Sequence, residues 1–236
     1  TAGTAASITA GTSATNTAAM TAGMNATITA VDAITNSGAM TATNGYATIT
    51  STNGNVVNAA TGTMTAGTYA KIVAGALVYN SGNMTANNDV TINAGTGVNN
   101  SGHLASLIDG DVEILANEGV INSNVLEAQH GSVTITSEHG AIINYNGADL
   151  YAGNGNVTLE TKAKVGETVV SIINEGDLAA NGNITLKSEN GNININNVDN
   201  LAQGFMHNID KYGLLIKIAK WISSISREKK KKIFGL

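Results

Sequence analysis

Apolar and polar residues alternate along most of the chain in short runs with the period of a β-strand. Clear examples are residues 26–29 (Ala-Thr-Ile-Thr) and 133–136 (Val-Thr-Ile-Thr). A period of two with β-branched residues is typical of a strand that buries one face. The buried positions are Ala, Val, Ile or Leu, whereas the outward positions form one mostly polar column: Ser7, Thr27, Thr48, Lys71, Thr91, Glu113, Thr134, Thr158 and Thr185.

A longer repeat is marked by a Met or Leu, usually with a small residue two places on. These anchors are Met20, Met40, Met64, Met84, Leu104, Leu126, Leu150, Leu178 and Leu201. Their spacing varies from 20 to 28 residues, which indicates strands of fixed length joined by corners of variable length. A third short strand ends each repeat, as at residues 78–80 and 120–122. Repeats this short exclude βαβ units, whose crossovers alone need about ten to twelve residues.

Three short strands per repeat predict an all-β fold, a right-handed parallel β-helix (solenoid) of about nine to ten rungs over residues 1–203, because parallel strands stack at about 4.8 Å. Asparagine stands four residues before the anchor in eight of nine repeats. The repeat leading to Met64 departs from this rule, with Ala60 at that offset and Asn58 two residues earlier. A side-chain amide both donates and accepts, so stacked asparagines would satisfy one another inside the coil. The expected ladder is Asn16, Asn36, Asn80, Asn100, Asn122, Asn146, Asn174 and Asn197.

The motif Asn-Ser-Gly-x-Met-x-Ala occurs at residues 36–42 and 80–86, and Gly-Asn-Ile-Thr-Leu at 182–186. These motifs resemble the haemagglutinin repeats of filamentous haemagglutinin-like exoproteins, the adhesins of two-partner secretion. The resemblance covers residues 1 to about 203. It implies a virulence-associated cell-adhesion stalk, secreted or on the bacterial cell surface, with an outer-membrane transporter as secretion partner and a host or bacterial surface receptor or glycan as ligand. Haemolysins and contact-dependent toxins share such a stalk.

Composition narrows the choice of class. The chain has no proline or cysteine, 4% aromatic and 12% charged residues. Its abundant small residues suit a narrow repetitive core and cannot fill the broad core of an α/β enzyme. Lack of cysteine excludes thiol nucleophiles and is compatible with export. The N-terminus has no signal-peptide features, so we expect a fragment or a processed product.

The charge divides the chain into two regions near residue 203. Residues 1–203 hold four lysines against fifteen acids (−11), and residues 204–236 hold eight bases against two acids (+6). The second region predicts a short amphipathic basic helix. It could cap the last rung, lie on an anionic membrane surface, or be an accidental extension of the reading frame. The residues expected to make the cap or membrane contact are Leu214, Ile218, Trp221, Ile222, Lys217 and Lys220.

Two other functions have some support in the sequence. Asp89 and Asp111 share an offset on adjacent rungs, with Asp109 beside them, so stacked carboxylates could serve a polysaccharide-active enzyme. We favour a solvated outer strand for these acids. The outward threonine column resembles an ice-binding array, but Lys71 and Glu113 interrupt it.

Catalytic and metal motifs are otherwise missing from the sequence. The three histidines of the repeat region lack metal-ligand spacing, and no serine lies in a Gly-x-Ser-x-Gly elbow. The charge of −11 would repel nucleic acid. We therefore predict no catalytic residue, no cofactor, no metal and no nucleic-acid partner, and a structural and adhesive stalk that is not an enzyme.

Overall fold

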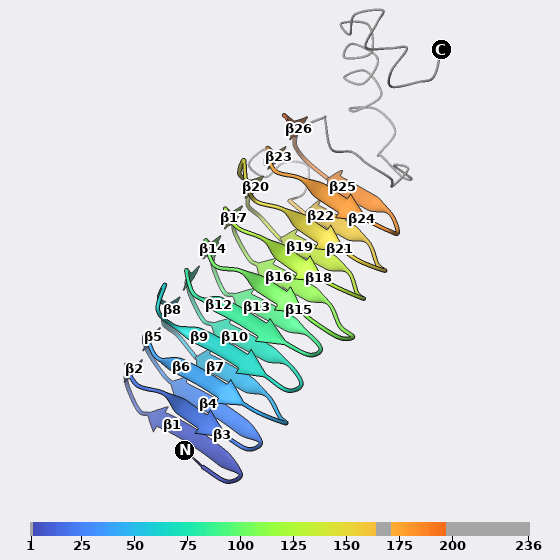
Figure 1. Ribbon diagram of the computed structural model, residues 1–236. Coiled ribbons are helices and arrows are strands. Elements are labelled where there is room, and N and C mark those ends of the chain that lie inside the picture. The colour runs from blue at the N-terminus through green and yellow to red at the C-terminus, as the bar shows by residue number, and fades with distance from the viewer. Residues whose placement is uncertain (1, 164–170, 197–236) are drawn as a thin grey trace, which may run out of the picture.

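The protein is an all-β parallel solenoid, described here from a computed structural model. The structure describes residues 2–163 and 171–196. Its turns stack one on another from the blue N-terminal turn to the orange C-terminal turns (Figure 1). Each turn contributes one strand to each of three sheets, and every strand pair is parallel, so the edge of each turn hydrogen-bonds to the next.

Sheet 1 contains the alternating strands that the sequence predicts, and they are the longest strands of each turn. Its nine strands are β1 (Ala5–Ala10), β4 (Asn25–Ala30), β7 (Ala47–Ser51), β10 (Ala70–Ala74), β13 (Val90–Ala94), β16 (Val112–Ala116), β19 (Val133–Ser137), β22 (Val157–Thr161) and β25 (Ile184–Ser188). Ile28 pairs with Ile49 and Ile72 with Ile92 in one inward column, and all four are fully buried.

Sheet 2 contains three-residue strands, and all of them except the last end in asparagine. Its nine strands are β2 (Ala14–Asn16), β5 (Ile34–Asn36), β8 (Val56–Asn58), β11 (Val78–Asn80), β14 (Val98–Asn100), β17 (Val120–Asn122), β20 (Ile142–Asn144), β23 (Ile172–Asn174) and β26 (Ile193–Ile195). The first and third residues of these strands face the core from β5 to β23, as the burial of Ile34 and Val78 shows.

Sheet 3 begins each strand at or just before the Met or Leu anchor. Its eight strands are β3 (Met20–Ala22), β6 (Ala39–Ala42), β9 (Thr63–Ala66), β12 (Asn83–Ala86), β15 (Leu104–Ser106), β18 (Leu126–Ala128), β21 (Leu150–Ala152) and β24 (Leu178–Ala180). The anchors stack in strict register, for example Met40 on Met64 and Leu104 on Leu126. All eight are buried, which confirms the predicted period from Met20 to Leu178. Leu201 lies outside the described residues.

The described strands make eight complete turns, and a ninth turn contributes β25 and β26. The predicted solenoid is therefore confirmed as a class, with fewer complete turns described than the nine to ten expected. No helix occurs in residues 2–163 or 171–196. The predicted amphipathic helix and the whole basic tail, residues 204–236, lie outside the described part of the chain.

Candidate functional site

The interior of the solenoid holds a continuous ladder of buried asparagine amides on sheet 2. Each Nδ2 except that of the last member donates to the Oδ1 of the asparagine one turn further on, at distances of 2.7 to 2.9 Å. The second N–H of Asn100 and of Asn122 donates to a corner carbonyl two residues ahead, at 2.8 and 2.7 Å. The members are Asn16, Asn36, Asn58, Asn80, Asn100, Asn122, Asn144 and Asn174.

The ladder differs from the predicted one at two positions. Asn58 belongs to the ladder, and Asn144 occupies the position assigned to Asn146, which is exposed. Both corners carry two extra residues before the anchor, so a fixed offset from the anchor selects the wrong residue. Asn174 pairs in register with Ile195, so the described ladder ends there, and Asn197 lies outside the described residues.

The acids Asp89 and Asp111, which the sequence offers as catalytic candidates, take part in a second column of bonds at the corner before sheet 1. The Oδ1 of Asp89 accepts the N–H of Asp111 at 3.0 Å, and the Oδ1 of Asp111 accepts the N–H of Ser132 at 2.7 Å. The side chains of Ser132 and Asn156 repeat this bond on later turns. Asp109, although exposed in the same corner, makes none of these bonds. Each of the two carboxylates thus satisfies a backbone N–H of the next turn, which is a structural role.

The outward threonines of sheet 1 are in register, since Ser7 pairs with Thr27 and Thr27 with Thr48. The next pair is Thr48 with Lys71, so the column is interrupted where the sequence places the lysine. Sheet 3 carries another threonine column at the position after each anchor: Thr21, Thr41, Thr65 and Thr85. The anchor pattern does not predict this column, because the pattern rests on the buried residues on either side of it.

After Thr85 the same outward column of sheet 3 changes character. It continues as Ala105, Glu127, Tyr151 and Ala179. Tyr151 stands at the middle of β21 and is 43% exposed, with the short side chain of Ala179 one turn later. The drop in side-chain size beside the ring leaves a hollow on an otherwise regular face.

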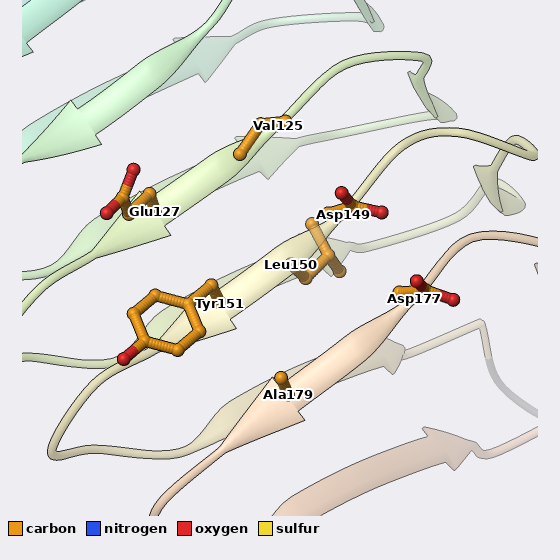
Figure 2. Close-up of a pocket in the computed structure, with 7 residues that line it drawn as sticks. All are labelled: Val125, Glu127, Asp149, Leu150, Tyr151, Asp177 and Ala179. Atoms are coloured by element: carbon orange, nitrogen blue, oxygen red, sulfur yellow. The ribbon is translucent and has the colours of Figure 1, made fainter. Parts of the chain in front are cut away.

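The hollow has a volume of about 400 Å³ and spans β18, β21 and β24 (Figure 2). Glu127, Asp149 and Asp177 supply carboxylates, and Val125 and Tyr151 supply apolar surface. Asp149 and Asp177 each precede an anchor, and the N–H of Leu150 donates to the Asp177 carbonyl at 2.9 Å, so these acids lie one turn apart. A pocket of this size is in the range that holds a small ligand.

The lining of the hollow is acidic. None of the seven lining residues carries a basic side chain. At its edge, His103 Nε2 lies 3.6 Å from Glu127 Oε2, an ion pair only when the histidine is protonated. Carboxylate oxygens accept strong hydrogen bonds from hydroxyl and ammonium groups, and an exposed tyrosine ring offers a flat apolar face. The arrangement can therefore hold a polar ligand that donates hydrogen bonds and has one apolar side.

Ion pairs on the outer surface involve two of the described lysines. Lys162 Nζ lies 2.9 Å from Glu138 Oε1, and Lys187 Nζ lies 2.6 Å from Glu160 Oε1. The hydrogen bond to Glu138 raises the pKa of Lys162, and the bond to Glu160 raises the pKa of Lys187. These pairs stabilise the outer surface and are not part of the hollow's lining.

The tyrosines do not form one column, but Tyr46 and Tyr69 occupy adjacent turns. Their rings stack with centroids 5.0 Å apart and planes inclined by 12°. Burial raises the pKa of Tyr69, and Tyr46 adds to the shift. The pair lies at the corner before sheet 1, where the Tyr46 N–H also donates a hydrogen bond to Asn25 Oδ1 at 3.3 Å.

No group of three or more histidine, aspartate or glutamate side chains within the described ranges could hold a metal ion. His130 and His139 are exposed at corners, and His103 is half-buried. In the same part of the chain no helix is long and apolar enough to span a membrane. The predicted tail contacts, Leu214, Ile218, Trp221, Ile222, Lys217 and Lys220, lie outside the described residues.

Comparison with protein-family models, with curated proteins and with solved structures found no match to this chain. The resemblance to haemagglutinin repeats therefore rests on the motifs alone. The solenoid and its internal ladder are established by the geometry.

Proposed function

We propose that this chain is a structural and adhesive rod, a stalk segment of a filamentous haemagglutinin-like adhesin that is secreted or held at a bacterial cell surface. One observation carries the proposal: the interior is filled by anchors and by an unbroken amide ladder, so ligands must meet the outer faces. The right-handed sense of the coil, further turns beyond the ninth and a capping or membrane role for the basic tail belong to the same proposal, as does an outer-membrane transporter for secretion.

The hollow on sheet 3 is the proposed contact surface of this rod. Its ligand would be an uncharged saccharide unit on a host or bacterial surface, with hydroxyl groups donating to Glu127 and Asp149 and an apolar sugar face on Tyr151. The volume of about 400 Å³ suits a small unit of this kind. Three carboxylates in the lining disfavour sialylated or sulphated glycans, because the negative charges of the protein would repel those of an anionic ligand bound in the hollow.

The proposal is tested by binding the full chain to an array of neutral and anionic glycans and, in parallel, to anionic vesicles. A second preparation ending at Gln203 removes the basic tail. Neutral-glycan binding retained by the shorter chain supports adhesion by the solenoid. Binding only to vesicles, and only with the tail present, would reject the adhesive role of the hollow and assign contact to residues 204–236.

A polysaccharide-active site on the Asp89 face is not proposed. One carboxylate oxygen of Asp89 and one of Asp111 each accept a hydrogen bond from a backbone N–H of the next turn. The threonine columns remain an ice-binding hypothesis without a specific observation in its favour.

A further inference from the structure

The asparagine that the ladder excludes lies in an unusual turn. Asn146 and Gly147 are the central residues of a turn closed by the Ala148 N–H, which donates to the Tyr145 carbonyl at 3.0 Å. Gly147 has a φ of +83°, a left-handed backbone conformation that glycine adopts without steric cost. Both central residues are exposed, so this corner projects away from the stack.

Asparagine followed by glycine is chemically labile, because glycine leaves the following backbone nitrogen unhindered by a side chain. The described residues contain five other such pairs: Asn44–Gly45, Asn53–Gly54, Asn154–Gly155, Asn181–Gly182 and Asn190–Gly191. Asn146–Gly147 is the one pair of the six in which both residues are exposed, because Asn190 is half-buried and the glycines of the other four pairs are buried or half-buried. The asparagine supplies the carbon that is attacked and the glycine supplies the attacking nitrogen, so the surroundings of both residues decide the rate.

The glycines of the first four of these pairs are held against the preceding turn. A Cβ atom on Gly45, Gly54, Gly155 or Gly182 would lie 2.3 to 2.4 Å from atoms of that turn, whereas one on Gly147 would meet nothing within 4 Å. The N–H of Gly54 donates to Ser51 Oγ at 2.9 Å, and that of Gly182 to the Gly155 carbonyl at 2.8 Å. Cyclisation at these four pairs must separate the glycine from the preceding turn. Cyclisation at Asn146 can leave the stacked turns in place.

We infer that Asn146 is a site of spontaneous modification, converted to aspartate or isoaspartate through a cyclic imide with Gly147. The Gly147 backbone nitrogen attacks Asn146 Cγ and forms a C–N bond. The side-chain nitrogen leaves as ammonia and takes the proton that the Gly147 nitrogen loses. Water then opens one C–N bond of the imide, which leaves a carboxylate. No oxidant, metal or enzyme is needed.

The product adds one negative charge to the turn that leads into β21, three residues before Asp149 of the hollow. An isoaspartate also inserts an extra backbone carbon between β20 and β21. The ladder is spared, because its member in this turn is Asn144. The modification thus alters the outer face of an old molecule and leaves its core intact.

The test is incubation of the folded full chain at mildly alkaline pH, with peptide mapping by mass spectrometry over time. We expect Asn146 to convert several-fold faster than each of the other five asparagines, and that lead to disappear when the chain is unfolded in denaturant. An Asn146→Gln variant should remove the fastest conversion without changing the melting temperature. Equal rates at the six pairs in the folded chain, or a faster rate at any of the other five, would overturn the inference.

Discussion

The Nδ2 atom of Asn100 lies 2.8 Å from the Oδ1 atom of Asn122, one full turn further along the solenoid. Asn122 in turn donates at 2.8 Å to Asn144, so its oxygen and nitrogen are both occupied within the core. A buried amide is costly unless it is bonded in this way. The ladder therefore favours one register of sheet 2, because a slip of one residue would turn the amide of the slipped strand away from the amides of the neighbouring turns.

Replacing Asn122 with leucine should break the ladder. The substitution leaves the Asn100 donor and the Asn144 acceptor unsatisfied, which costs about 1 to 3 kcal/mol each. The free energy of unfolding in urea measures the loss. Asn146→Leu is the matched control, because Asn146 is exposed and outside the ladder, and it should change that free energy little. Equal effects of the two substitutions would contradict the internal ladder.

Gly82 should not tolerate even a methyl group. A Cβ atom there would lie 1.8 Å from the Gly62 carbonyl oxygen, which is backbone and cannot move alone. Opening the stack at this corner should cost about 1 to 3 kcal/mol or more. Gly11→Ala is the control, since nothing lies within 4 Å of its Cβ position. Thermal melting of the two variants tests the difference, and an unchanged melting temperature for Gly82→Ala would show that the corners are looser than described.

Asp111 should behave as a structural cap. Asp111→Ala removes the acceptor of the Ser132 N–H and should cost about 1 kcal/mol. Asp111→Asn keeps an oxygen at that position and should retain most of the stability. The two variants are compared by chemical denaturation. If asparagine proved as damaging as alanine, the negative charge, and not the acceptor geometry, would be what the corner needs.

The ion pair of Lys187 with Glu160 should depend on pH in one direction. The pKa of Lys187 is raised from 10.5, so the pair's contribution is present below that pH and is lost as pH rises through the higher folded-state value. Both side chains are partly exposed, so the contribution should not exceed about 1 kcal/mol. The difference in unfolding free energy between the native chain and Glu160→Gln should shrink above pH 10.5. A difference that grows there would contradict the assignment.

The strands and anchors could be predicted from the sequence because each turn repeats the same inward pattern. The errors arose at the corners. Asn58 is followed by a turn in which the Gly62 N–H donates to the Ala59 carbonyl, and Asn144 by the turn from Tyr145 to Ala148. Each turn absorbs two extra residues without shifting the strand before it. Counting back from the anchor therefore fails, whereas counting forward from the sheet 2 strand gives the right asparagine.

The hollow could not be found in the same way. It depends on three outward side chains from different turns, and outward positions follow no repeat. Tyr151 and Ala179 are in register although their anchors are 28 residues apart, the longest spacing between anchors in the chain. The one usable signal was the position after each anchor, where threonine gives way to Glu127 and Tyr151.

The most direct measurement of the proposed adhesive role is neutral-glycan binding by Tyr151→Ala beside Tyr79→Ala, using the glycan that the array identifies. The two tyrosines are 43% and 40% exposed, and each is the middle residue of a three-residue strand, but Tyr79 lies on sheet 2, away from the hollow. Both variants should melt like the native chain. We expect binding to fall at least tenfold, about 1.4 kcal/mol, for Tyr151→Ala and to be unchanged for Tyr79→Ala. Undiminished binding by Tyr151→Ala would show that the hollow is not the contact surface.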